Sequence, residues 1–125
     1  MTMEISHIWL GNFPSKESYL EYVKESYSEN DDEPINQFAQ DQDVLFYDTD
    51  WEESFYDDSS DLKELIVLAS YSKDYINRVI SDAKTRGIES ANTFIIVDKE
   101  EIPHPKSIEG ENYKLWYMGE YECSV

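Results

Sequence analysis

The chain has 125 residues, of which 28 are acidic and 10 are basic, so its formal net charge is −18. This length predicts one domain over residues 1–125, because two domains would each fall near the lower size limit for a self-sufficient core. The charge repels nucleic-acid phosphates and anionic lipids, which disfavours binding to nucleic acid or membrane. It favours a cation, a metal or a basic protein as partner. Aromatic residues make up 14% of the chain, which is ample core material for an ordered fold.

The cysteine content and the N-terminus predict where the protein works. Cys123 is the one cysteine, so no internal disulfide can form and a reducing cytoplasm fits best. The first residues show no basic region followed by an apolar run, so we expect no signal peptide. No apolar stretch approaches the roughly 20 residues that a membrane span needs. We therefore expect a cytoplasmic protein that is monomeric when free.

The N-terminal part predicts a strand followed by two helices. Residues 5–13 are apolar and rich in β-forming residues, which indicates a buried strand that ends near Gly11. Ser15 is then placed to cap a helix over residues 16–27. After a polar linker, Pro34 suits the first turn of a second, shorter helix.

The middle of the chain is harder to assign. Residues 44–47 form a short apolar run that predicts a strand. Residues 48–61 are acidic and aromatic, and their pattern fits a strand or a loop equally well. Residues 62–69 contain an uncharged apolar run, which predicts a buried central strand, although a helix fits this length as well.

The C-terminal part predicts one helix and two strands. Ser72 is placed to cap a helix over residues 73–86, and Gly87 is well placed to end it. Residues 93–97 predict a strand, and residues 113–121 predict a last strand rich in aromatics. The whole order predicts an α+β fold: a mixed or antiparallel sheet of about five strands, with two main helices and one short helix on one face. A split βαβ arrangement of ferredoxin-like type is one candidate.

Acidic residues are concentrated in one part of the chain. Between Glu29 and Asp61 there are 13 acidic residues and no lysine or arginine. The first predicted helix adds a glutamate at every fourth position, which places like charges side by side at a cost of about 0.2–0.5 kcal/mol per pair. Either this charge forms a solvated, solubilising face, or it forms a surface for a basic partner.

Aromatic residues are interspersed with the carboxylates of residues 46–58, and such rings are typical anchors of protein interfaces. We expect Tyr47 and Tyr56 to be exposed because a phenol needs a polar partner, whereas Phe46, Trp51 and Phe55 fit the core or the surface equally well. The predicted partner-binding residues are Glu21, Glu25, Tyr47, Asp48, Asp50, Trp51, Glu52, Glu53, Tyr56, Asp57 and Asp58.

Patterns that would indicate catalysis or metal binding are weak. His7 and His104 have no metal-ligand spacing, and we expect them to be packed or to face solvent. Cys123 has no adjacent base. The acidic residues that begin at Asp48 resemble a calcium loop but lack its central glycine and distal glutamate. We therefore predict no catalytic residue, no metal site and no cofactor.

Four short segments carry a family resemblance: His7-Ile8-Trp9-Leu10-Gly11-Asn12-Phe13 with the helix after it, Tyr47-Asp48 to Ser54-Phe55, Ser70-Tyr71-Ser72, and Ala91-Asn92-Thr93. In this order they resemble the immunity protein 22 family of bacterial polymorphic-toxin and contact-dependent inhibition systems. The resemblance runs from about residue 5 to residue 98 and leaves residues 99–125 unmatched. It implies a non-enzymatic, cytoplasmic protein that protects its producer by binding one cognate toxin domain.

The residues and the resemblance together favour an immunity protein that occludes a basic toxin, with nucleases as one candidate class because they need a positive cleft for phosphates. The alternative is an acidic nucleic-acid mimic or regulatory adaptor that binds a basic host protein. A small enzyme or a calcium-binding domain is a third reading, and it requires a carboxylate-lined pocket.

Overall fold

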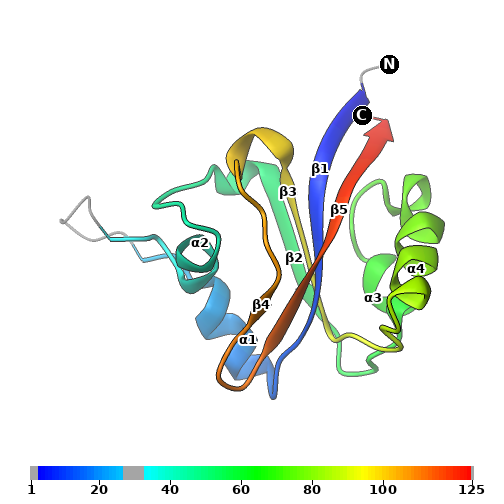
Figure 1. The fold of residues 1–125 in the computed structure, drawn as a ribbon, viewed down its shortest axis with the longest axis horizontal. Coiled ribbons are helices and arrows are strands. Elements are labelled where there is room, and N and C mark those ends of the chain that lie inside the picture. Colours follow the sequence, from blue (N-terminus) through cyan, green and yellow to red (C-terminus); the bar gives the residue numbers. More distant parts are fainter. Residues whose placement is uncertain (1–2, 27–32, 125) are drawn as a thin grey trace.

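The computed structural model describes residues 3–26 and 33–124, and in them five strands form one antiparallel sheet (Figure 1). The strand order is β2-β3-β1-β5-β4, so β1 lies at the centre, paired with β3 and β5. The strands are β1 (Met3–Asn12), β2 (Glu52–Tyr56), β3 (Thr93–Asp98), β4 (Ile108–Glu109) and β5 (Lys114–Ser124). The α+β class and the five-stranded sheet are confirmed.

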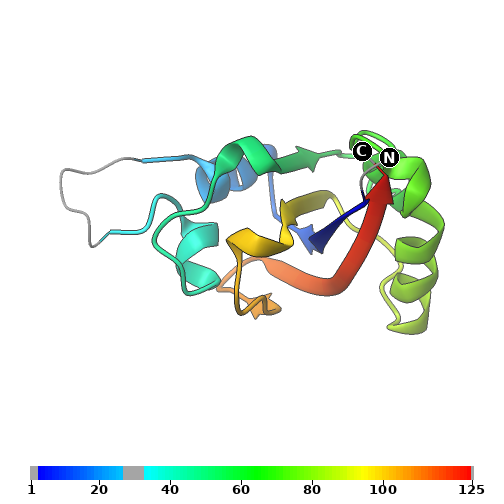
Figure 2. The same cartoon turned by 90° about the horizontal axis from the view of Figure 1, so that it is seen from above.

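Helices cover both faces of this sheet, so the prediction that they lie on one face is wrong. Figures 1 and 2 show α1 and α2 on one side and α3 and α4 on the other. The helices are α1 (Lys16–Val23), α2 (Gln37–Asp41), α3 (Leu62–Ile66) and α4 (Ile76–Thr85). Three single 3₁₀ turns complete the described elements: η1 (Thr49–Trp51) before β2, η2 (Ser72–Asp74) before α4, and η3 (Lys99–Glu101) directly after β3.

The central strands explain why two helical layers form. Successive residues of a strand point to opposite faces. On β1, Ile8 and Leu10 join the core beneath α3 and α4, whereas Trp9 joins the core beneath α1 and α2. On β3, Phe94 and Ile95 divide in the same way. Because these strands are apolar on both faces, each face needs a cover, and one helical layer would leave a core open to water.

The ferredoxin-like candidate is confirmed only in part. β3 lies between β1 and β2 and pairs antiparallel with both, so β1 and β2 are parallel, and the segment that joins them carries α1 and α2. This is a split βαβ unit. The rest departs from a ferredoxin-like fold, because α3 and α4 join β2 to β3 and cover the other face of the sheet.

Two predicted helix-end signals, the N-cap of α1 and the glycine after α4, are confirmed. Ser15 and Ser18 form a reciprocal capping box at the start of α1. Gly87 follows the last turn of α4 with a φ of 76°, a conformation that favours glycine. Three helix boundaries differ from prediction. α1 ends at Val23, with Tyr27 outside the described residues, and α4 begins only after η2, so Ser72 does not cap it. α2 begins at Gln37 with Asn36 as its cap, so Pro34 lies before the helix and not in its first turn.

The two apolar segments predicted as strands are not strands. Residues 62–66 form α3, because the Asp61 carboxylate caps the Glu64 amide and the apolar residues at 62, 65 and 66 face the core at helical spacing. Residues 44–47 hydrogen-bond to the α2 region instead of to the sheet, through Val44 N to Ala39 O and Ile35 N to Leu45 O. The undecided acidic segment supplies β2 at one edge of the sheet.

A β-bulge lies in the pairing of β1 with β5. The register shifts between Ile8 and Trp9, which face Gly119 and Tyr117 respectively, so Met118 is the extra residue. Gly119 has a φ of 124°, a backbone conformation that L side chains rarely adopt. The bulge therefore depends on a glycine at this position.

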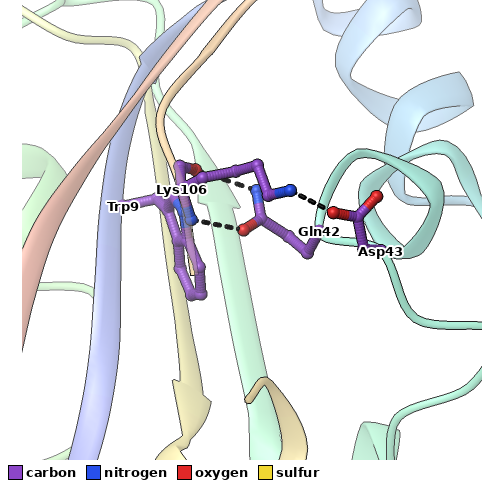
Figure 3. A network of polar contacts seen from close by, with 4 residues as sticks. All are labelled: Trp9, Gln42, Asp43 and Lys106. Atoms are coloured by element: carbon purple, nitrogen blue, oxygen red, sulfur yellow. Dashed lines mark hydrogen bonds and ion pairs between the residues drawn. The ribbon is translucent and has the colours of Figure 1, made fainter. Parts of the chain in front are cut away.

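A buried amide ties the β3–β4 connection to α2 (Figure 3). The Gln42 side chain donates to Lys106 O at 3.0 Å and accepts from Lys106 N at 2.8 Å. The Trp9 indole donates to the same carbonyl at 3.1 Å, and Lys106 Nζ pairs with Asp43. Because Gln42 is fully buried, these bonds hold the segment after Pro105 in one place.

Candidate functional site

Four carboxylates surround a hollow at the end of the sheet where β2 begins. The hollow has a volume of about 410 Å³, and of the described residues that line it none is basic. We call it the acidic hollow and define it by Glu4, Asp50, Glu53 and Asp98. Ser6, Ile96 and Cys123 also line it. Glu52 borders it too, but its carboxylate lies on the α1–α2 face, where it interacts with Tyr47 and Ser54.

Strand register brings these residues together from four strands. On the α3–α4 face, Glu4 of β1 lies opposite Cys123 of β5, and Ser6 lies opposite Asp98 of β3. Glu53 of β2 lies opposite Ile96 of β3. Since neighbouring strands are about 4.8 Å apart, side chains distant in sequence come to share one surface.

The electrostatics of the hollow are those of crowded negative charge. Burial raises the pKa of the Cys123 thiol, and the nearby charges of Glu4, Asp98 and Glu53 raise it further. On the other face of the sheet, burial raises the pKa of Glu52 to about 7, with a smaller contribution from the charge of Glu25. The ion pairs of the described residues all lie away from the hollow.

The turn after α3 forms one wall of the hollow. We call residues 67–71 the apolar turn, because Val67, Leu68 and Tyr71 are 56%, 51% and 52% exposed. Ser70 joins this turn to β2, since Glu53 Oε1 accepts hydrogen bonds from Ser70 N at 3.2 Å and Ser70 Oγ at 3.1 Å. The apolar turn and the hollow are therefore one continuous structural unit.

The structure brings together part of the predicted partner-binding set. Asp48, Asp50, Glu52 and Glu53 lie at the start of β2, and the last three line the hollow. Asp57 and Asp58 follow the other end of β2, roughly 13 Å along the strand from Glu53. Asp57 caps the turn there by accepting from Ser59 N, which is a local structural role.

The structure buries Tyr47 and half-buries Tyr56, both of which we expected to be exposed. Tyr47 is 1% exposed, so the prediction that it faces solvent is wrong. Its phenol oxygen accepts from Asn36 Nδ2 at 2.9 Å, which supplies the polar partner inside the core, and its ring packs edge-on against Phe38. Tyr56 is half-buried beside Tyr19, and Phe46 is 59% exposed.

The remaining predicted residues lie elsewhere or outside the description. Glu21 is exposed on α1, which covers the face opposite α3 and α4. Glu25 follows α1 and adds negative charge near Glu52 and Tyr47. Trp51 ends η1, but its side chain lies outside what the structure describes.

Sequence reasoning missed Glu4, Asp98 and the apolar turn. Glu4 and Asp98 are single charges in separate strands, and only the sheet places them together. Val67 and Leu68 belong to the apolar run that predicted a buried strand. Their exposure follows from helical phase, because positions 62, 65 and 66 face the core and positions 67 and 68 then point away from it.

The described residues contain no group of three or more His, Cys, Asp or Glu that could hold a metal ion. His7 is a core residue, as one of the two predicted settings requires: its Nε2–H donates to Ile102 O at 3.0 Å and its Nδ1 accepts from the Tyr117 hydroxyl at 2.8 Å. Burial lowers the pKa of His7, which favours this neutral form.

Residues 6–123 match the family model described as Immunity protein 22. The chain belongs to this family. Membership of the immunity protein 22 family confirms the resemblance, extends it through residue 123, and points to toxin neutralisation with a cognate toxin as the partner. No curated protein and no solved structure matches the chain. Among the described residues, no helix has the length and apolarity that a membrane span requires.

Proposed function

We propose that the chain neutralises one cognate toxin domain by covering a basic surface of that toxin with the acidic hollow and the start of β2. The observation that carries this proposal is the convergence of Glu4, Asp50, Glu53 and Asp98 on one hollow whose described lining has no basic residue. The chain acts by stoichiometric binding and needs no catalytic group for it.

The charge distribution supports association with a basic surface. A net charge of −18 attracts a basic partner from a distance, and the local cluster orients it. Complementary charge raises association rates from a typical ~10⁵–10⁶ M⁻¹ s⁻¹ to as much as ~10⁸–10⁹ M⁻¹ s⁻¹ at low salt. Fast capture suits an inhibitor that must act before its toxin damages the cell.

A nuclease is the toxin class that fits this surface best. Nucleases hold phosphates with lysine and arginine side chains, so their substrate surface is positive. An acidic protein that covers such a surface competes with the nucleic acid by charge as well as by shape. The proposal therefore predicts that substrate and chain exclude each other on the toxin.

The test is protection of a bacterial host that expresses the toxin domain encoded beside this chain. Co-expression of the chain restores growth, and in vitro the purified chain abolishes toxin activity near a 1:1 ratio. Continued growth arrest, with both proteins soluble and at comparable levels, contradicts the proposal.

A charge-matched pair of variants locates the effect. Replacing Glu4 and Asp50 by lysine reverses two charges of the hollow, whereas replacing Glu89 and Glu111 by lysine reverses two exposed charges elsewhere. Both variants have the same net charge. We expect the first to lose protection and the second to keep it, while equal protection by both removes the hollow from the site.

A further inference from the structure

We infer that the apolar turn and the acidic hollow form one docking surface, and that its occupant is a projecting segment of the toxin with an arginine or lysine flanked by apolar side chains. This inference rests on the proposed function and adds the face, the anchors and the chemistry of the docked segment. It places docking on the α3–α4 side of the sheet and not on α1.

The exposed side chains of the turn are unusual for this chain. Three large apolar or aromatic residues lie within five positions, and each is more than half exposed. Immediately before them, Leu65 and Ile66 are fully buried. Single exposed apolar residues are ordinary on protein surfaces, but a contiguous group beside a charged rim is typical of interaction sites.

The turn presents these side chains in a fixed arrangement. Its backbone is held at several points: Ser70 bonds to the Glu53 carboxylate, the Tyr75 hydroxyl donates to Ser70 O at 3.0 Å, and Val67 N donates to Lys63 O at 3.0 Å. A surface that is already ordered loses little conformational entropy when it binds. The turn is therefore a rigid anchor.

The size of the hollow and the spacing of its carboxylates favour a basic side chain over a metal ion. Its volume of about 410 Å³ accommodates a long side chain, and its carboxylates are not grouped closely enough to hold a metal ion. A guanidinium group has a planar set of donors that two carboxylates can share, and an aromatic ring at the rim can stack on it. Tyr71 is the ring that lines the hollow, next to Val67 and Leu68 along the turn.

Charge complementarity decides between this surface and α1. Leu20 on α1 is also exposed, at 49%, and the predicted Glu21 and Glu25 lie near it in sequence. However, the carboxylates that converge on a hollow lie beside the apolar turn. A toxin segment that buries a basic side chain and its apolar neighbours together finds both partners at this surface.

The test measures binding of the toxin domain encoded beside this chain by biolayer interferometry. Leu68→Ser is compared with Leu20→Ser, because the two leucines have nearly equal exposure. Leu20 belongs to α1 and Leu68 follows α3, and these helices cover opposite faces of the sheet. We expect Leu68→Ser to raise Kd at least about 10-fold, mainly through faster dissociation, and Leu20→Ser to leave Kd within about 2-fold. Urea unfolding of both variants verifies that they fold.

Two further variants separate the ring from the charge. Tyr71→Asn removes the ring at a position with a φ of 57°, where asparagine is well tolerated, and we expect Kd to rise at least about 10-fold. Glu4→Gln removes one charge from the hollow, and we expect slower association and a weaker dependence on salt. The control is Glu111→Gln, which changes an exposed residue away from the hollow. It should leave the association rate and its salt dependence unchanged.

The outcomes distinguish this inference from the proposed function. If the unaltered chain does not bind the toxin domain, the proposed function fails. If it binds and Leu20→Ser weakens the complex while Leu68→Ser and Tyr71→Asn do not, the function stands and the inferred surface is wrong. If light scattering shows a dimer that Leu68→Ser dissociates, the turn is covered by a second copy and the inference is overturned.

Discussion

Replacing Glu52 by glutamine tests whether this carboxylate is destabilising in the free protein. Glu52 is the first residue of β2, and its carboxylate interacts with the hydroxyls of Tyr47 and Ser54. Burial raises its pKa from 4.5 to about 7, and the charge of Glu25 adds to the effect. Glutamine keeps the size and the acceptor oxygen but carries no charge.

The pKa gives both the sign and the size of the effect. Between pH 4.5 and about 7 the folded state binds more protons at Glu52 than the unfolded state does, so the unfolding free energy falls as the pH rises through this window. Each pKa unit is worth about 1.4 kcal/mol, and screening of a side chain that is not fully buried reduces the total to about 2 kcal/mol. Above pH 7 this stability is fully lost.

Urea unfolding followed by aromatic fluorescence at pH 4.5 and pH 8 measures the effect. We expect the free energy of unfolding of Glu52→Gln to exceed that of the unaltered protein by about 2 kcal/mol at pH 8. At pH 4.5 the two free energies should agree within about 0.5 kcal/mol. The control Glu111→Gln changes an exposed residue, and its free energy of unfolding should stay within about 0.5 kcal/mol of that of the unaltered protein at both pH values. The reasoning is refuted if Glu52→Gln gives no gain at pH 8 or the same gain at both values.

Three other substitutions test the scaffold. Gln42→Ala leaves buried backbone groups of Lys106 unpaired and should cost about 2–3 kcal/mol in urea unfolding, whereas the exposed Gln40→Ala costs under about 0.5 kcal/mol; equal costs would rule out the amide lock. Because burial lowers the pKa of His7 below 6.5, the unfolded state binds more protons at this residue, and the free energy of unfolding falls as the pH drops from 6.5 to 5. His7→Gln should show a smaller fall over this range than the unaltered protein, and an equal fall contradicts this. Gly119→Ala should cost about 1–2 kcal/mol in thermal unfolding through its backbone alone, since the added methyl meets no atom within 4 Å; an unchanged midpoint contradicts the role of the bulge.

Local signals were enough to predict several elements of the fold. The cap at Ser15 and the glycine at Gly87 depend on hydrogen bonds and φ angles within a few residues, so the sequence around them determines the outcome. The β-branched and apolar run at 93–97 likewise forms β3. The start of the acidic, aromatic segment lies at the hollow, which Asp50 and Glu53 line.

Features that depend on pairing between distant segments could not be predicted in this way. An apolar run of five residues fits a strand or a helix, and the choice at 65–69 depends on the Asp61 cap and the core beneath α3. Helices cover both faces of the sheet because β1 is a central strand. That position depends on the pairing of β1 with β3 and β5, which its own sequence does not reveal. The hollow joins Glu4 to Glu53 across the sheet, and no spacing along the chain reveals that approach.

The most direct test of charge-complementary capture is the association rate of the unaltered chain with the toxin domain encoded beside it, measured by stopped flow from low to high salt. We expect a rate constant above ~10⁷ M⁻¹ s⁻¹ near 20 mM NaCl that falls at least about 10-fold by 500 mM NaCl. A complex that forms at the same rate at both salt concentrations would contradict the account, because capture would then not depend on the carboxylates of the acidic hollow.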